Sequence, residues 1–332
     1  TLLENRVASR ETFGEIVADE RKKMRALVAK TLTEPKITTQ EDERDRSVFP
    51  PFSFTSPEEK PRGSAAGTRM SYNKAFAWIV GQILKEDERA VYYGEDIANS
   101  RGGVLALSKG VFTEFPSRAW NTPISEEAIV ATAAGRALAG GKPMFEFQFA
   151  PFDKDAFRTL AHVIAPNWYL KKLVFDLVAV YPCGVVHGGG SGHFHESWPE
   201  RFLVPMEGIV VVAPSDAHDV AGLLRAAHEY GGPVAMLLQI AAASLPDFYS
   251  EVPEEPFAIP LGKARVVREG TDVSVITYGA ACVSAAKNEA EELAKEGISL
   301  EVIDLRTVHP WDTAAILASV AKTGRCLVFH ED

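Results

Sequence analysis

The stretch Trp120-Asn121-Thr122-Pro123-Ile124-Ser125-Glu126-Glu127 opens a helix whose surroundings decide the fold. Ser125 is a good N-cap, and Gly140 or Gly141 is a good stop, so we expect the helix to begin at Glu126. The segment between these limits is rich in alanine. The plainest interpretation of the first-turn carboxylates is that they complement the positive end of the helix dipole. The rest of the chain favours a chemical role for Glu126.

Helices and apolar strands alternate around this stretch from Met70 onward. The pattern predicts strands at 90–93, 144–149, 173–180, 209–213 and 234–238, and helices at 71–85, from 126, at 153–170 and at 216–230. Alternation of this kind is typical of a doubly wound, mostly parallel α/β sheet.

Composition divides the chain further. Residues 1–34 have an amphipathic helical pattern, and residues 35–68 read as a linker rich in proline, glycine and charge. The main α/β domain is expected at 69–240, followed by an interdomain connection at 241–257 and a second α/β domain at 258–332. In this last domain we expect strands at 273–277 and 300–305, a helix at 281–295 and another from Pro310 or Asp312 to about 321.

The overall composition excludes several classes of protein. A formal charge of −10 without a basic stripe argues against nucleic-acid binding. The 332 residues contain no apolar run long enough to cross a membrane. Cys183, Cys282 and Cys326 are widely spaced, so we expect reduced thiols and neither a disulfide framework nor a zinc site.

A glycine-rich segment at 186–197 carries His187, His193 and His195. The three imidazoles could bind a metal, although their spacing matches no zinc signature. A phosphate-binding loop is disfavoured because no Lys-Ser/Thr follows the glycines. The segment could also be a solvated loop, or a catalytic loop that presents a histidine for proton transfer near neutral pH.

Many short motifs follow one another in a fixed order from about Met70 to Asp332. They lie at 94–98 (Gly-Glu-Asp-Ile-Ala), 102–104, 121–126, 146–150, 194–197, 213–215, 260–264, 302–312, 322–325 and 330–332. Together they resemble the β subunit, or β half, of the thiamine-diphosphate-dependent E1 component of 2-oxo acid dehydrogenase complexes. That family belongs to the transketolase-like superfamily, with a pyrimidine-binding domain and a C-terminal α/β domain. The resemblance implies that fold here, with the C-terminal domain incomplete.

The resemblance also implies roles for individual residues. The position of Glu126 hydrogen-bonds N1′ of the cofactor aminopyrimidine, which helps the 4′ nitrogen to take the proton from thiazolium C2. The positions of Ile124, Gln148 and Phe152 line the pyrimidine, although an aromatic side chain such as Phe152 is equally consistent with plain core packing. The position of His195 faces the substrate and the incoming lipoyl group, and donates or relays protons.

Two segments depart from the family pattern. Glu196-Ser197-Trp198 follows the histidine where the family usually has Ser-Gln-Ser or Ser-Gln-Thr, and Pro151 stands where Asp or Asn is common. The first of these changes alters charge and bulk beside the expected site. The family includes enzymes that act on pyruvate, branched-chain 2-oxo acids and acetoin-type substrates, and the sequence does not choose among them.

The chain also lacks the Gly-Asp-Gly motif with which thiamine enzymes hold the Mg²⁺ of the diphosphate. In the family this motif lies on the α subunit, so the resemblance implies half a site here, with Mg²⁺ liganded by the α part. The implied partners are an E1 α subunit or region and the lipoyl domain of E2, in an α2β2 assembly or a dimer of fused chains. Residues 1–34 resemble the last helix of an α region, which suggests a fused α–β parent. The alternative is a β subunit with an unusual N-terminal extension.

The predicted reaction is oxidative decarboxylation of a 2-oxo acid with acyl transfer to lipoamide, in a bacterial cytoplasm or a mitochondrial matrix. One alternative is a transketolase or deoxyxylulose-phosphate synthase relative, although those carry Gly-Asp-Gly in the same chain. A second is a non-catalytic subunit that completes a partner's site. A third is a metal enzyme built on the three histidines.

Overall fold

The computed structural model describes residues 9–33, 48–59, 62, 67–98, 102–103, 106–184, 193–243 and 245–331. The chain divides into two compact units, Thr1–Ser47 and Val48–Asp332. The first contains helix α1 (Arg10–Thr33), on which Ile16, Met24 and Leu27 are exposed. Much of the expected linker 35–68 lies outside the described residues. None of the helices in the described part of the chain is long and apolar enough to cross a membrane.

The second unit is built on a seven-stranded sheet in the order β12-β6-β7-β5-β4-β2-β3. Its strands are β2 (Ala90–Gly94), β3 (Ala119–Asn121), β4 (Lys142–Glu146), β5 (Leu177–Cys183), β6 (Val210–Val212), β7 (Pro233–Gln239) and β12 (Thr307–His309). All neighbouring pairs are parallel except β12 with β6. The predicted doubly wound, mostly parallel sheet is therefore confirmed.

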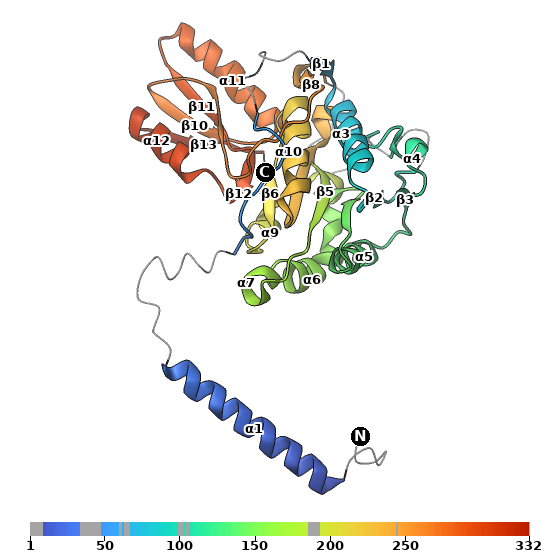
Figure 1. Ribbon diagram of the computed structural model, residues 1–332. Coiled ribbons are helices and arrows are strands. Elements are labelled where there is room, and N and C mark those ends of the chain that lie inside the picture. Colours follow the sequence, from blue (N-terminus) through green and yellow to red (C-terminus); the bar gives the residue numbers. More distant parts are fainter. Residues whose placement is uncertain are drawn as a thin grey trace. The chain divides into compact units, whose positions relative to one another are not determined.

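Helices cover both faces of this sheet, as its fully buried central strands β5 and β7 require. Alternate residues of each strand enter opposite cores: Tyr92 and Val180 enter one, while Tyr93 and Ala179 enter the other. Helices α3 (Tyr72–Glu86) and α10 (Ala217–Tyr230) build the first core, and α5 (Glu126–Leu138) belongs to the second (Figure 1). The sheet is thereby buried on both sides.

A second, four-stranded sheet has the order β13-β10-β11-β9. It comprises β9 (Arg265–Arg268), β10 (Val273–Thr277), β11 (Leu300–Asp304) and β13 (Cys326–Val328), with helices α11 (Ala280–Lys295) and α12 (Thr313–Thr323). After β11 the chain returns to the first sheet as β12, which joins the two domains through backbone hydrogen bonds. The sequence did not predict β12, nor the small ribbon of β1 (Gly67–Met70) and β8 (Ser250–Pro253).

The prediction was wrong in three places. The strand expected at 173–180 is found at Leu177–Cys183. The strand expected at 144–149 ends at Glu146, because the chain leaves the sheet and enters the 3₁₀ segment η1 (Ala150–Ala156). The single helix expected at 153–170 is instead η1, α6 (Phe157–Thr159), the π-helical η2 (Leu160–Ile164) and α7 (Asn167–Lys171). Pro166 lies between the last two and cannot continue an α-helical hydrogen-bond ladder.

Candidate active site

The carboxyl ends of the parallel strands meet at one edge of the large sheet, where α/β proteins bind their ligands. Beyond β2, the Ala98 amide donates to Asn121 Oδ1, at the end of β3, over 2.6 Å. Gln148 follows β4, and its Nε2 donates to Asp96 Oδ2 over 3.0 Å. Gly94 allows the ends of β2 and β4 to lie close together, since a Cβ at this position would lie 2.5 Å from the Glu146 carbonyl oxygen.

Glu126 is the first residue of α5, as predicted, and its side chain is half-buried. Ser125 has the extended backbone of an N-cap but makes no side-chain cap hydrogen bond. The pKa of the nearby Glu95 carboxyl is raised, mainly by burial and secondly by the charge of Glu126. A hydrogen bond from the Ser125 amide to Glu95 lowers this pKa in part. Two carboxyl groups thus share the space at the start of α5.

His195 lies in the short helix α8 (His193–Glu196) and packs against two aromatic rings. Its ring centroid is 4.7 Å from Phe149 at 82° and 5.3 Å from Phe152 at 70°. The two phenylalanines also meet edge to face, at 5.8 Å. Phe152 is half-buried. It therefore has an accessible surface beside the imidazole in addition to its packing role.

The predicted site residues form two contact groups at the same sheet edge. Glu126 interacts with Glu95, whereas His195 interacts with Phe152. Gln148 connects the groups, because its partner Asp96 directly follows Glu95. Ile124, two residues before Glu126, is 86% exposed. Residues 185–192 and the side chain of His193 lie outside the described part, so the three-histidine metal hypothesis falls largely outside it too.

Comparison with known families decides what this architecture is. The transketolase pyrimidine-binding domain family matches residues 68–242, and the transketolase C-terminal domain family matches residues 262–332. The chain is 36% identical over 270 residues to the 2-oxoisovalerate dehydrogenase subunit β of Bacillus subtilis, covering 79% of this chain and 80% of that one. The chain belongs to the E1 β family.

Other relatives agree. The pyruvate dehydrogenase E1 component subunit β of Staphylococcus aureus is 39% identical over 251 residues, covering 75% of each chain. The 2-oxoisovalerate dehydrogenase subunit β of Dictyostelium discoideum is 38% identical over 296 residues, covering 86% of this chain and 77% of that one. A solved structure titled as an inactive β4 tetramer of a split-gene transketolase shares the fold, with a TM-score of 0.63, 23% identity and coverage of 78% of each chain.

The buried Glu95 and Glu146 and the half-buried Phe149, all at the site of this E1 β-type chain, were missed as candidates. Glu95 was noted only as part of a motif, and Glu146 and Phe149 only as parts of a motif and of an expected strand. Glu146 is fully buried, and burial raises its pKa to about 7, although the Tyr92 hydroxyl donates a hydrogen bond to it and lowers the value. A Cβ on Gly103 would lie 3.7 Å from Glu146 Oε1. The available signal was position: each of these residues lies at or just beyond a strand end.

Asp153 is a further buried acid, one residue beyond Phe152. It is 2% exposed, and its Oδ2 has no hydrogen-bond partner within the described part of the chain. Burial raises its pKa to about 7, with Lys154 acting in the opposite direction. The buried Tyr181 hydroxyl, whose own pKa is raised by burial and by the charge of Asp153, likewise has no partner there.

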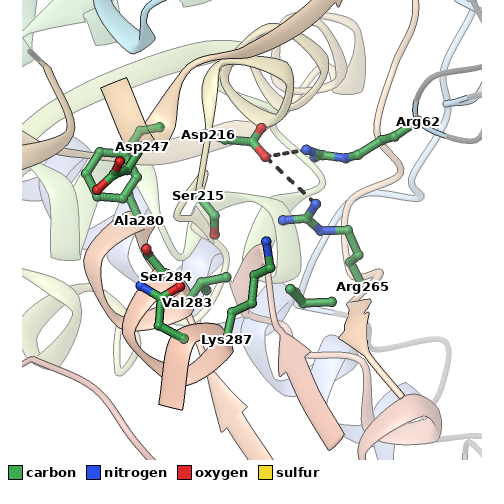
Figure 2. A pocket seen from close by; sticks show the side chains of 12 residues that line it. Arg62, Ser215, Asp216, Asp247, Arg265, Ala280, Val283, Ser284 and Lys287 are labelled. Atoms are coloured by element: carbon green, nitrogen blue, oxygen red, sulfur yellow. Dashed lines mark hydrogen bonds and ion pairs between the residues drawn. The ribbon is translucent and has the colours of Figure 1, made fainter. Parts of the chain in front are cut away.

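The E1 β-type chain has a second concentration of charge where its two domains meet. A cavity of about 500 Å³ lies there, and Figure 2 shows Arg62 and Arg265 both directed at Asp216 on its wall. Behind it, Asp219 accepts from Arg62 Nη2 at 2.6 Å and pairs with Arg306 Nε at 3.0 Å. None of the predicted site residues lines this cavity. Its arginines already have carboxylate partners, which indicates a structural role.

We call this second cluster the junction ion network. It consists of Arg62, Arg265 and Arg306 with Glu59, Asp216, Asp219 and Asp304. Burial would raise the pKa of Asp219, but the charges of Arg306, Arg265 and Arg62 lower it far below its usual range. Glu59, His218 and Asp219 bring ligand atoms within 4.8 Å of one another. Because arginines already occupy both carboxylates, ion pairing accounts for that group.

Proposed function

We propose that this chain is the E1 β-type part of a 2-oxo acid dehydrogenase. In this role it supports thiamine-diphosphate-dependent oxidative decarboxylation of pyruvate or a branched-chain 2-oxo acid, with acyl transfer to lipoamide of E2. The observation that carries the proposal is the position of the buried Glu95 at the start of α5, where the Ser125 amide donates to it and the charge of Glu126 acts on it. The names of its relatives, E1 β subunits of both substrate types, support it.

The residues at this edge fit thiamine diphosphate. Glu95 Oε1 is buried and has no hydrogen-bond partner within the described part, so the start of α5 offers a polar group that a ligand could satisfy. We assign Glu126, Ile124, Gln148 and Phe152 to the pyrimidine ring, with Glu126 accepting from N1′. When bound, the cofactor supplies the nucleophilic carbon and accepts the electrons released by decarboxylation. The chain supplies a carboxylate, an amide and an aromatic face that fix its orientation.

His195 is assigned to proton transfer at the substrate. Its imidazole packs edge to face against Phe149 and Phe152, which fix the orientation of the ring. An imidazole in a fixed orientation is suited to general acid–base catalysis. We assign it to protonation steps on the substrate and on the lipoyl group that receives the acyl unit.

The α part of E1 is the proposed partner. It would carry the Gly-Asp-Gly motif that this chain lacks, and hence the ligands of Mg²⁺. Ile124 is 86% exposed and Phe194 is 64% exposed, and both flank the proposed catalytic residues. Large apolar side chains beside a site are suited to burial against another chain. We further propose an α2β2 assembly or a dimer of fused chains.

We retain the domain division predicted from sequence, with the pyrimidine-binding domain at 69–240 and the C-terminal domain at 258–332. The matched family ranges, 68–242 and 262–332, support this division. Relatives occur in bacteria and in mitochondria. We propose the bacterial cytoplasm as the compartment, with the mitochondrial matrix as the alternative.

The test is 2-oxo acid decarboxylation by the assembled E1 that contains this chain, measured with an artificial electron acceptor. Activity should require thiamine diphosphate and Mg²⁺. Glu126→Gln should lower kcat at least about 100-fold, because the neutral amide cannot replace a carboxylate in acid–base catalysis. Glu127→Gln is the matched control: this neighbour instead accepts from Thr159 Oγ1 over 2.7 Å, and its loss should cost little activity. Full activity in Glu126→Gln would favour the non-catalytic interface subunit instead.

A further inference from the structure

Trp198 connects the two domains beside the helix that carries His195. It follows His195 by three residues and is 3% exposed. Its indole Nε1 has no hydrogen-bond partner among the residues that the structure describes. A buried tryptophan normally satisfies its N–H, so the side chain contributes here through its shape and volume.

The indole is held between two glycines that end strands of different sheets. Gly184 follows β5 of the large sheet, and a Cβ there would lie 3.1 Å from Trp198 Nε1. Gly279 follows β10 of the small sheet, and a Cβ there would lie 2.8 Å from Trp198 Cη2. One ring therefore fills the space between the two strand ends, and neither glycine can gain a side chain without displacing it.

Tyr278 of the C-terminal domain contacts the segment that carries Trp198 at two points. Tyr278, the residue before Gly279, meets the indole edge to face at 5.7 Å and 82°. The Tyr278 hydroxyl donates to Glu200 Oε1 over 3.3 Å, and its ring stacks on His330 at 6.0 Å. Nearby, Gln239 Oε1 accepts from the Ala281 amide over 2.7 Å, at the start of α11. A displacement of the indole would therefore act on the chain segment that also carries His195.

Helix α8 contains only His193–Glu196, a length at which helical hydrogen bonds alone give little rigidity. On the proposed function, in which His195 transfers protons, we propose that Trp198 is a positioning residue. Wedged between Gly184 and Gly279, it sets the place of the His195 ring against Phe149 and Phe152. The C-terminal domain thereby helps to define the active site of the other domain.

Gly279→Ala tests this without touching α8. The new Cβ pushes the indole from the C-terminal side, and the φ of +79° adds backbone strain. Gly297→Ala is the matched control, with a similar φ of +85° and no atom within 4 Å of the new Cβ. In the assembled E1, Gly279→Ala should slow acyl transfer to the lipoyl domain about 10- to 100-fold, since small misplacements of catalytic groups have effects of this size. Gly297→Ala should stay near the wild-type rate.

A second substitution tests the mechanism. Trp198→Phe places a smaller ring between the two glycines. Added to Gly279→Ala, it should therefore recover part of the lost rate of acyl transfer. Such a non-additive effect is expected of residues in contact. In isotope-labelled protein without cofactor, Gly279→Ala should shift the His195 ring resonances and Gly297→Ala should not. Thiamine diphosphate affinity should be the same in both alanine variants.

Equal rates and equal His195 resonances in Gly279→Ala and Gly297→Ala would overturn the positioning role. So would a double variant no faster than Gly279→Ala, or a loss of cofactor affinity that accounts for the slower rate. If Gly279→Ala does not fold, Trp198→Phe alone must still shift the His195 resonances for the role to stand. An inactive wild-type assembly would instead refute the proposed function, and the resonance comparison would still decide the coupling.

Discussion

Two groups of buried acids in this protein have opposite surroundings. Glu95, Glu146 and Asp153, which we call the unpaired carboxyls, have no ion-pair partner within the described residues, and burial raises the pKa of each. In the junction ion network, Asp219 is as deeply buried, yet three arginines lower its pKa. Arginines thus stabilise the charged form of the buried acid where the two domains meet. At the strand ends, and in η1 beyond β4, the absence of such partners in the described part leaves carboxyls with raised pKa values, as is common at proton-transfer sites.

The largest expected effect comes from breaking the junction ion network. Arg306→Met removes both hydrogen bonds to Glu59, at 2.8 and 2.9 Å, and one of the charges that stabilise Asp219. Loss of one partner from a buried ion pair costs about 3–5 kcal/mol, because the other charge remains buried. Denaturant unfolding should show this loss.

Lys295→Met is the control for that measurement. Lys295 pairs with Glu292 at 2.6 Å on the exposed surface of α11, so its removal should change stability little. Equal losses in the two variants would mean that burial does not distinguish the network from an ordinary surface pair.

Asp153→Asn should increase the free energy of unfolding, whereas Arg306→Met should decrease it. Burial raises the pKa of Asp153 from 3.8 to about 7, so between those values the folded state holds a proton that the unfolded chain releases. The contribution of this group to stability therefore falls as pH rises from about 4 to about 7. The asparagine variant should gain up to about 4 kcal/mol at pH 8, from roughly three pKa units, and little at pH 4.

Unfolding of the variant and wild type across pH 4–8 measures this gain. Asp155→Asn, at an exposed position two residues on, is the control and should give parallel profiles. If the free energy of unfolding of Asp153→Asn differs from that of the wild type by the same amount at every pH, the raised pKa of Asp153 is wrong. Asp153 would then no longer belong to the unpaired carboxyls with raised pKa values.

The smallest expected effect concerns Glu146. The Tyr92 hydroxyl donates to its carboxylate and lowers the pKa, so Tyr92→Phe should raise that pKa above 7 by about one unit, the worth of one hydrogen bond to a charged group. Infrared titration of the protonated carboxyl band would measure the shift. Tyr93→Phe is the control, because that hydroxyl donates to the Ile129 carbonyl at 3.3 Å. A lowered pKa in Tyr92→Phe would contradict the assignment.

Local patterns predicted the elements well where nothing interrupted them. The strand expected at 273–277 was found at Val273–Thr277, and the helix expected at 216–230 was found at Ala217–Tyr230. The prediction failed at 153–170, where Pro166 and the departure from β4 break the regular period. It also missed β12, since the antiparallel pairing of Thr307–His309 with β6 depends on a partner nearly a hundred residues away.

The sequence by itself determined the α/β class and the start of α5 at Glu126, because caps, turns and apolar periodicity act within a few residues. Motif order identified the family, and with it Glu126 and His195 as the residues to watch. Only the tertiary structure placed Glu95 beside Glu126 and His195 between two phenylalanines. Those contacts depend on strand order, which brings together the ends of β2, β4 and β5 from distant parts of the chain. No local rule specifies that order, because it follows from how both faces of one sheet are buried.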